Sequence, residues 1–112
     1  MRVDAEVPFR QLMRSGRLAT LRNYPYKRGQ RIYVKHKGKV VGLAVVEFVA
    51  DYERWLLTAP TDKLPEVLAI SGFSSFKEWE DEARRLNKDD RVPKYLVIIR
   101  LLKKYDSIRG SS

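Results

Sequence analysis

The stretch from Pro8 to Val46 contains ten arginine and lysine residues and no aspartate or glutamate. These residues are Arg10, Arg14, Arg17, Arg22, Lys27, Arg28, Arg31, Lys35, Lys37 and Lys39. The rest of the chain has 13 basic and 14 acidic residues, so the formal net charge of +9 is concentrated in this stretch. Because such a stretch cannot pair its own charges, it creates a positive field that attracts polyanions.

Aromatic side chains are interleaved with these cations. Phe9, Tyr24, Tyr26 and Tyr33 all lie within the acid-free stretch. Flat rings next to positive charges are the combination on which unpaired bases stack while their phosphates are neutralised. The sequence therefore predicts a nucleic-acid partner, and RNA is our first hypothesis.

The binding residues that we predict share one chemistry, which is donation to phosphate or stacking on bases. A guanidinium offers planar, paired donors to a phosphate oxygen pair. The predicted set is Arg17, Thr20, Arg22, Tyr24, Tyr26, Lys27, Arg28 and Arg31. We expect phosphates on the cations in one basic cleft, with the tyrosines at its rim. Thr20 is also the one candidate for a catalytic group, although we assign no catalytic residue.

Secondary-structure signals indicate how these residues are positioned. Helices are expected over 8–15, from 65 to about 72, and from 75 to about 86, where Ser75 and Glu78 have capping-box spacing. Strands are expected over 2–6, 18–22, 30–36, 39–50 and 95–102, with a hairpin turn at Lys37-Gly38. The segment 51–58 is read as extended or irregular, without an assignment.

The order of these elements predicts an α+β domain. We expect one domain over 1–106, a small PUA-like pseudo-β-barrel of five or six mixed strands with two or three flanking helices, and a disordered tail over 107–112. The apolar run from Tyr95 to Leu102 is predicted to be its central buried strand.

Four segments resemble the ASCH domain family of the PUA-like superfamily. They are Ser15 to Arg22, Tyr26 to Ile32, Gly72 to Trp79, and the apolar closing strand. The resemblance covers nearly the whole chain and implies a pseudo-barrel with a cleft and a role in RNA binding. Thr20 and Arg22 match the threonine and arginine of the family motif, whereas Arg17 falls at its lysine position.

Two departures from that pattern bear on catalysis. Some ASCH-like hydrolases that remove acetyl from a modified cytidine look to use lysine, threonine and glutamate together, and the glutamate position corresponds to Ser71 here. Arg17 stays protonated and cannot act as a base, and Ser71 supplies no carboxylate. We therefore favour a binding cleft. The alternatives are a hydrolase or ribonuclease acting on RNA or modified nucleosides, and a protein-interaction subunit.

Each site residue also has a purely structural interpretation. Arg17 and Arg22 are equally well explained as surface arginines paired with carboxylates of the C-terminal half. Thr20 is a good strand former, and Tyr24, Tyr26 and Tyr33 can pack on a barrel. The position of the carboxylates decides between these interpretations.

Composition excludes several other classes of protein. The 112 residues include no cysteine and a single histidine, His36, which excludes a disulfide framework and the usual zinc sites. We expect no metal, no cofactor and no membrane segment, because no apolar run reaches 18 residues. A cytoplasmic monomer or weak dimer is expected. The 33% of charged residues, with few Asn and Gln, is typical of thermophilic proteins.

Overall fold

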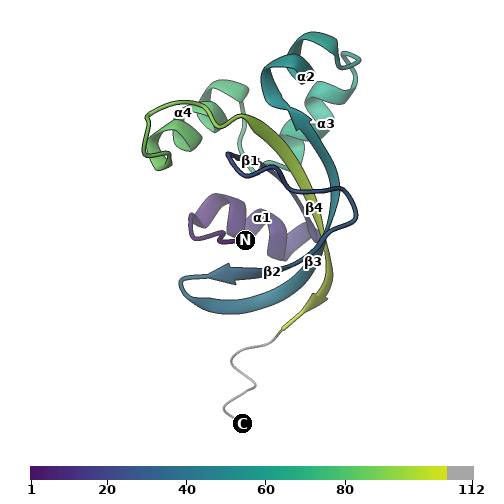
Figure 1. The fold of residues 1–112 in the computed structure, drawn as a ribbon, viewed down its shortest axis with the longest axis vertical. Coiled ribbons are helices and arrows are strands. Elements are labelled where there is room, and N and C mark those ends of the chain that lie inside the picture. The colour runs from purple at the N-terminus through teal and green to yellow at the C-terminus, as the bar shows by residue number, and fades with distance from the viewer. Residues whose placement is uncertain (106–112) are drawn as a thin grey trace.

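The computed structural model describes residues 1–105, which form four helices and four strands (Figure 1). In chain order the elements are α1 (Glu6–Ser15), β1 (Arg17–Arg22), β2 (Arg31–His36), β3 (Lys39–Asp51), α2 (Tyr52–Thr58), α3 (Lys63–Ala69), α4 (Phe76–Leu86) and β4 (Tyr95–Lys104). The tail predicted over 107–112 lies outside the described residues.

The four strands form one open antiparallel sheet in the order β1-β4-β3-β2. The α+β class is confirmed, but a barrel of five or six mixed strands is wrong. Of the strand predicted over 2–6, only one bridge is present, in which Arg2 pairs with Lys35. The following residues enter α1 at Glu6.

The segment after β3 is helical rather than extended. The Asp51 carboxylate accepts a hydrogen bond of 3.1 Å from the backbone N–H of Arg54, which satisfies one of the free donors at the start of α2. Tyr52 and Trp55 then lie on the buried side of this helix. The N-cap therefore ends β3 and starts a helix within the segment that the sequence left without an assignment.

The remaining elements agree with the sequence within a few residues. The helices α1 and α3 begin two residues before Pro8 and Pro65, since proline is tolerated throughout the first helical turn, where N–H groups have no helical partner. The predicted turn at Lys37-Gly38 has positive φ at both residues, 50° and 84°, as a tight hairpin requires.

Both faces of the sheet bury a core cluster, because side chains alternate along each strand. Leu18 of β1 packs with Leu12 of α1 and with Val97 and Ile99 of β4 on one face. On the other face, the alternate residues of β1 and β4 pack against α2, α3 and α4, with Tyr52, Trp55 and Trp79 at the centre. In Figure 1 the curved sheet wraps around α1.

The connection between α3 and α4 is held against α1 by Gly72. This glycine has φ of +87°, and a Cβ built on it would lie 3.1 Å from both Gln11 Cβ and Val7 Cγ1 of α1. Only glycine satisfies both the left-handed backbone and the close approach. The contact fixes the start of α4 next to the N-terminal part of the chain.

Candidate functional site

A cleft of about 720 Å³ opens between the N-terminal segment, the end of β1 with the loop that follows it, and α4. Its size lies in the range of small-molecule sites, which is roughly 300–1,000 Å³. Of the eight predicted binding residues, four line this cleft: Thr20, Arg22, Tyr24 and Tyr26. Arg17, Lys27, Arg28 and Arg31 do not line it.

Arg22 and Thr20 lie next to each other on the β1 wall of the cleft. They are on the same face of the strand, and Arg22 Nε donates a hydrogen bond of 3.1 Å to Thr20 Oγ1. Thr20 is buried, and Arg22 is partly buried. Desolvation lowers the pKa of Arg22, although an arginine remains charged at any working pH.

Within residues 1–105 the Arg22 guanidinium forms no ion pair with a carboxylate. Its bond to Thr20 is the only side-chain hydrogen bond that it makes there. No fully buried side-chain nitrogen or oxygen in this part of the chain lacks a partner, so the two terminal nitrogens of Arg22 reach solvent. Because Arg22 lines the cleft, these nitrogens are donors that a ligand in the cleft could use.

The other charged side chains that line the cleft are paired with each other. Arg2 contacts Asp4 at 3.3 Å, and Arg85 forms an ion pair with Glu82. Asp4 Oδ1 also accepts a 2.7 Å hydrogen bond from the backbone N–H of Lys37, and this bond is the main reason that the pKa of Asp4 is lowered. Arg22 is thus the one lining cation that forms no ion pair within residues 1–105, although the Asp4 carboxylate is near enough to oppose the effect of desolvation on its pKa.

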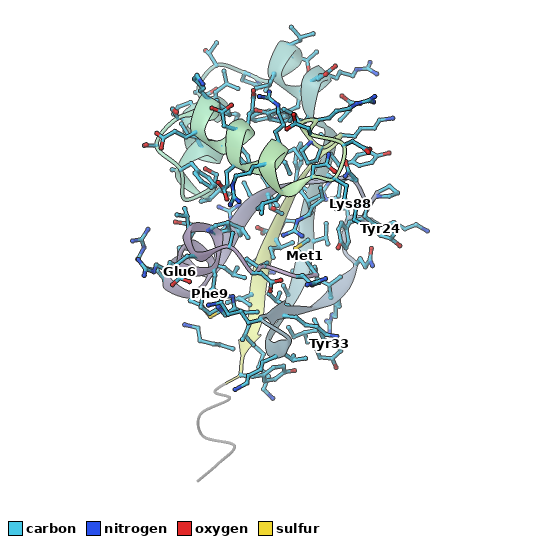
Figure 2. The ribbon with its side chains drawn as sticks, turned by 90° about the vertical axis from the view of Figure 1, so that its left-hand side faces the viewer. Met1, Glu6, Phe9, Tyr24, Tyr33 and Lys88 are labelled. Atoms are coloured by element: carbon cyan, nitrogen blue, oxygen red, sulfur yellow. The ribbon has the colours of Figure 1, made fainter. Side chains whose placement is uncertain are left out.

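Two tyrosines and two asparagines form the mouth of the cleft. The rings of Tyr24 and Tyr26 meet edge to face at 4.7 Å, and Tyr24 is 60% exposed whereas Tyr26 packs on the core cluster beside α1. Asn23 Nδ2 donates a 3.0 Å hydrogen bond to Asn87 Oδ1, which joins the loop after β1 to the end of α4. Figure 2 shows Tyr24 and Lys88 on the same side of the molecule. Tyr24 is therefore the ring available for stacking.

Arg17 lies on the opposite face of β1 from Thr20 and Arg22, because odd and even residues of a strand point to opposite sides. Its Nε donates a 3.0 Å hydrogen bond to Glu47 Oε1, and Arg100 donates to the other carboxylate oxygen at 3.3 Å. The expected gathering of Arg17 and Arg22 in one cleft is therefore not observed. The ion-pair interpretation is confirmed for Arg17, whereas Arg22 forms no ion pair within residues 1–105.

The remaining predicted cations are exposed and lie away from the cleft. Lys27 and Arg28 lie in the loop between β1 and β2, and Arg31 is the first residue of β2. None of the three forms a side-chain hydrogen bond or an ion pair within residues 1–105. The acid-free stretch of the sequence is thus spread over more than one surface.

The residues that correspond to a hydrolase triad are not assembled. Ser71 is fully buried, donates to Leu68 O at 2.6 Å and accepts from Phe73 N at 3.1 Å, so it caps a turn after α3 rather than lining the cleft. The hydrogen-bond partner of Thr20 Oγ1 is a guanidinium, which cannot accept a proton. Within the described chain, no general base lies in hydrogen-bond contact with Thr20.

Sequence reasoning missed several residues of the cleft. Asn23, Asn87, Arg2 and Arg85 line it, and Leu86 beside them is 58% exposed. These residues come from the N-terminal part of the chain and from the end of α4, and no local pattern connects them. The only available signal was the polar Asn23 directly after a strand end, where binding residues are often found.

Comparison of the chain with family models, with curated proteins and with solved structures found no match. Residues 1–105 contain no group of three or more His, Asp and Glu side chains arranged to hold a metal ion. Over the same residues, no helix has the length and apolar character needed to cross a bilayer.

Proposed function

We propose that this protein binds RNA and that the cleft beside β1 holds one phosphate of the strand on Arg22. The observation that carries the proposal is the Arg22 guanidinium, which is partly buried, lacks a carboxylate partner within residues 1–105 and lines a cleft. Placing an unpaired cation in a desolvated position costs free energy, and a bound anion would recover it.

The polar groups around Arg22 fit a nucleotide better than a bare anion. The Thr20 hydroxyl and the side chains of Asn23 and Asn87 offer hydrogen bonds to sugar or base, and the exposed ring of Tyr24 at the mouth offers a surface for stacking. The protein carries a formal net charge of +9, which attracts a polyanion from a distance. An RNA strand combines all of these chemistries.

A binding role is favoured over hydrolysis of RNA or modified nucleosides by the surroundings of Thr20. A threonine nucleophile needs a neighbouring base, and the group next to Thr20 is the Arg22 guanidinium. In this arrangement the hydroxyl helps to orient Arg22 and remains able to donate its own proton to a ligand oxygen. We therefore propose Arg22 and Thr20 as a binding pair.

The test is a fluorescence titration of single-stranded RNA, duplex RNA and DNA at two salt concentrations, with product analysis in the same samples. Replacing Arg22 by alanine removes a charge-assisted contact and should weaken single-stranded RNA binding roughly tenfold or more. Arg22→Lys should restore only part of the loss, because lysine lacks the planar fork. Cleaved RNA in the wild-type samples would contradict a purely binding role and would indicate a ribonuclease.

The matched control is Arg54→Ala, which removes an exposed arginine of α2 that does not line the cleft. Both variants lose one positive charge, so a general electrostatic effect would weaken them equally. Equal affinity of the two variants, with unchanged melting temperatures, would contradict the role of Arg22.

A further inference from the structure

The sheet has a second exposed surface, on the side opposite α1 and beyond the part covered by α2, α3 and α4 (Figure 1). We call it the open face and define it by the strand positions that point to this side. They are Arg17 of β1, Arg31, Tyr33 and Lys35 of β2, Leu43, Val45 and Glu47 of β3, and Arg100 and Lys103 of β4.

The strand register places three of these arginines in one row across the whole sheet. Arg31 is opposite Val45, Val45 is opposite Arg100, and Arg100 is opposite Arg17. Side chains at directly opposed positions share a face and lie next to each other. At about 4.8 Å between strands, the row spans roughly 14 Å.

A second row lies beside the first, nearer the hairpin end of the sheet. It consists of Tyr33, Leu43 and Lys103, which the register also places opposite one another. Tyr33 is 57% exposed, and Figure 2 shows it projecting outward near the lower end of the molecule. Arg31 and Lys35 flank this tyrosine at two residues on either side, so all three point the same way.

The open face has a strong excess of positive charge. Its defining positions include five cations and one carboxylate, that of Glu47. The Arg17 and Arg100 side chains are 48% and 49% exposed, and each uses only its Nε on Glu47. The terminal guanidinium nitrogens of both arginines therefore remain available to a ligand.

We propose that the open face is a second RNA-binding surface, across which a single strand lies with its phosphates on the arginine row and a base on Tyr33. Charge complementarity calls for a polyanion, and the exposed ring between two cations favours one that carries bases over an acidic protein. A four-stranded sheet face with an exposed aromatic is a surface on which unpaired bases stack. This inference takes from the proposed function only the assumption that the ligand is RNA.

The first measurement changes the charge of the open face. Arg31→Gln combined with Lys35→Gln should weaken binding of single-stranded RNA about tenfold, and each lost phosphate contact should reduce the log-log salt slope by about 0.7. The control is Arg54→Gln combined with Lys63→Gln, which removes two cations from α2 and α3. Equal salt slopes for the two double variants would overturn the proposal.

The second measurement separates stacking from charge. Tyr33→Leu should weaken binding about tenfold without changing the salt slope, whereas Tyr33→Phe should bind like the wild type. Glu47→Gln should act in the opposite direction and strengthen binding about threefold, because it removes the only carboxylate of the face. An unchanged affinity in Tyr33→Leu would contradict base stacking at this position.

The outcomes distinguish this inference from the proposed function. If Arg22→Ala weakens binding but the open-face variants match their control, the cleft stands and the open face fails. If only the open-face variants lose affinity, the role of the cleft fails and the open face stands. If poly-glutamate displaces RNA from the Arg22→Ala variant at equal charge concentration, the open face binds acidic chains in general and the RNA assignment is overturned.

Discussion

Two carboxylates decide the behaviour of the arginines in β1. Glu47 neutralises Arg17 on one face of the strand, whereas Asp4, on the other side, is engaged by Arg2 and by the backbone N–H of Lys37. Arg22 is therefore left with a hydroxyl oxygen as its partner. Two arginines five residues apart in one strand thus have different chemistry, and the difference comes from side chains distant in the sequence.

Glu47 should also stabilise the fold. Arg17 and Arg100 are directly opposed on neighbouring strands, and like charges in that position repel. We expect Glu47→Gln to lower the free energy of unfolding by about 0.5–1 kcal/mol, since the pairs are half exposed and screened. Urea unfolding at low salt would measure this loss. Glu66→Gln, which breaks a more exposed pair with Lys63 within α3, should cost less.

At the scale of elements, the cleft depends on the packing of the α3–α4 connection against α1. Replacing Gly72 by alanine combines a left-handed backbone with a Cβ that meets Val7 and Gln11. We expect a loss of about 2–4 kcal/mol in the free energy of unfolding. Gly29→Ala is the matched control, because its φ is +85° but nothing lies within 4 Å of the added atom. A similar loss in both variants would show that the contact with α1 contributes nothing.

The elements themselves were largely predictable because their signals are local. The capping box of α4, the hairpin turn and the apolar run of β4 each follow from residues a few positions apart, and all three are confirmed. The start of α2 was missed because one N-cap carboxylate, Asp51, overrides the strand pattern that precedes it. The number of strands was overestimated because a short alternating segment near Arg2 forms a single bridge rather than a strand.

The site was less predictable than the elements, since it depends on the arrangement of the whole molecule. The sequence shows which residues are cationic, but not which side of the sheet each one faces after the bulges in β3. Side chains alternate along a strand, so Arg17 and Arg22, which are an odd number of residues apart in β1, point to opposite faces of the sheet. The ion pair with Glu47 spans 30 residues and has no local signature.

With both proposed surfaces occupied, the affinity should depend on the length of the RNA. The cleft and the open face lie on different sides of β1, so a short oligonucleotide contacts one of them and a long one can contact both. We expect an oligonucleotide of about 20 nucleotides to bind roughly 100-fold more tightly than one of about 6 nucleotides. The Arg22→Ala variant should lose most of this increase. A gain simply proportional to the number of nucleotides would argue against simultaneous contact.

The hydrogen bond between the Asn23 and Asn87 amides at the cleft mouth helps in interpreting how RNA binding depends on salt and pH. Neither side chain titrates, and their 3.0 Å bond involves no ionic group, so this link across the entrance does not itself respond to acidity or to electrolyte. A response of ligand capture to ionic conditions then reports on the charged groups of the cleft, which are Arg22 and the pairs Arg2–Asp4 and Arg85–Glu82, rather than on a loosening of this link.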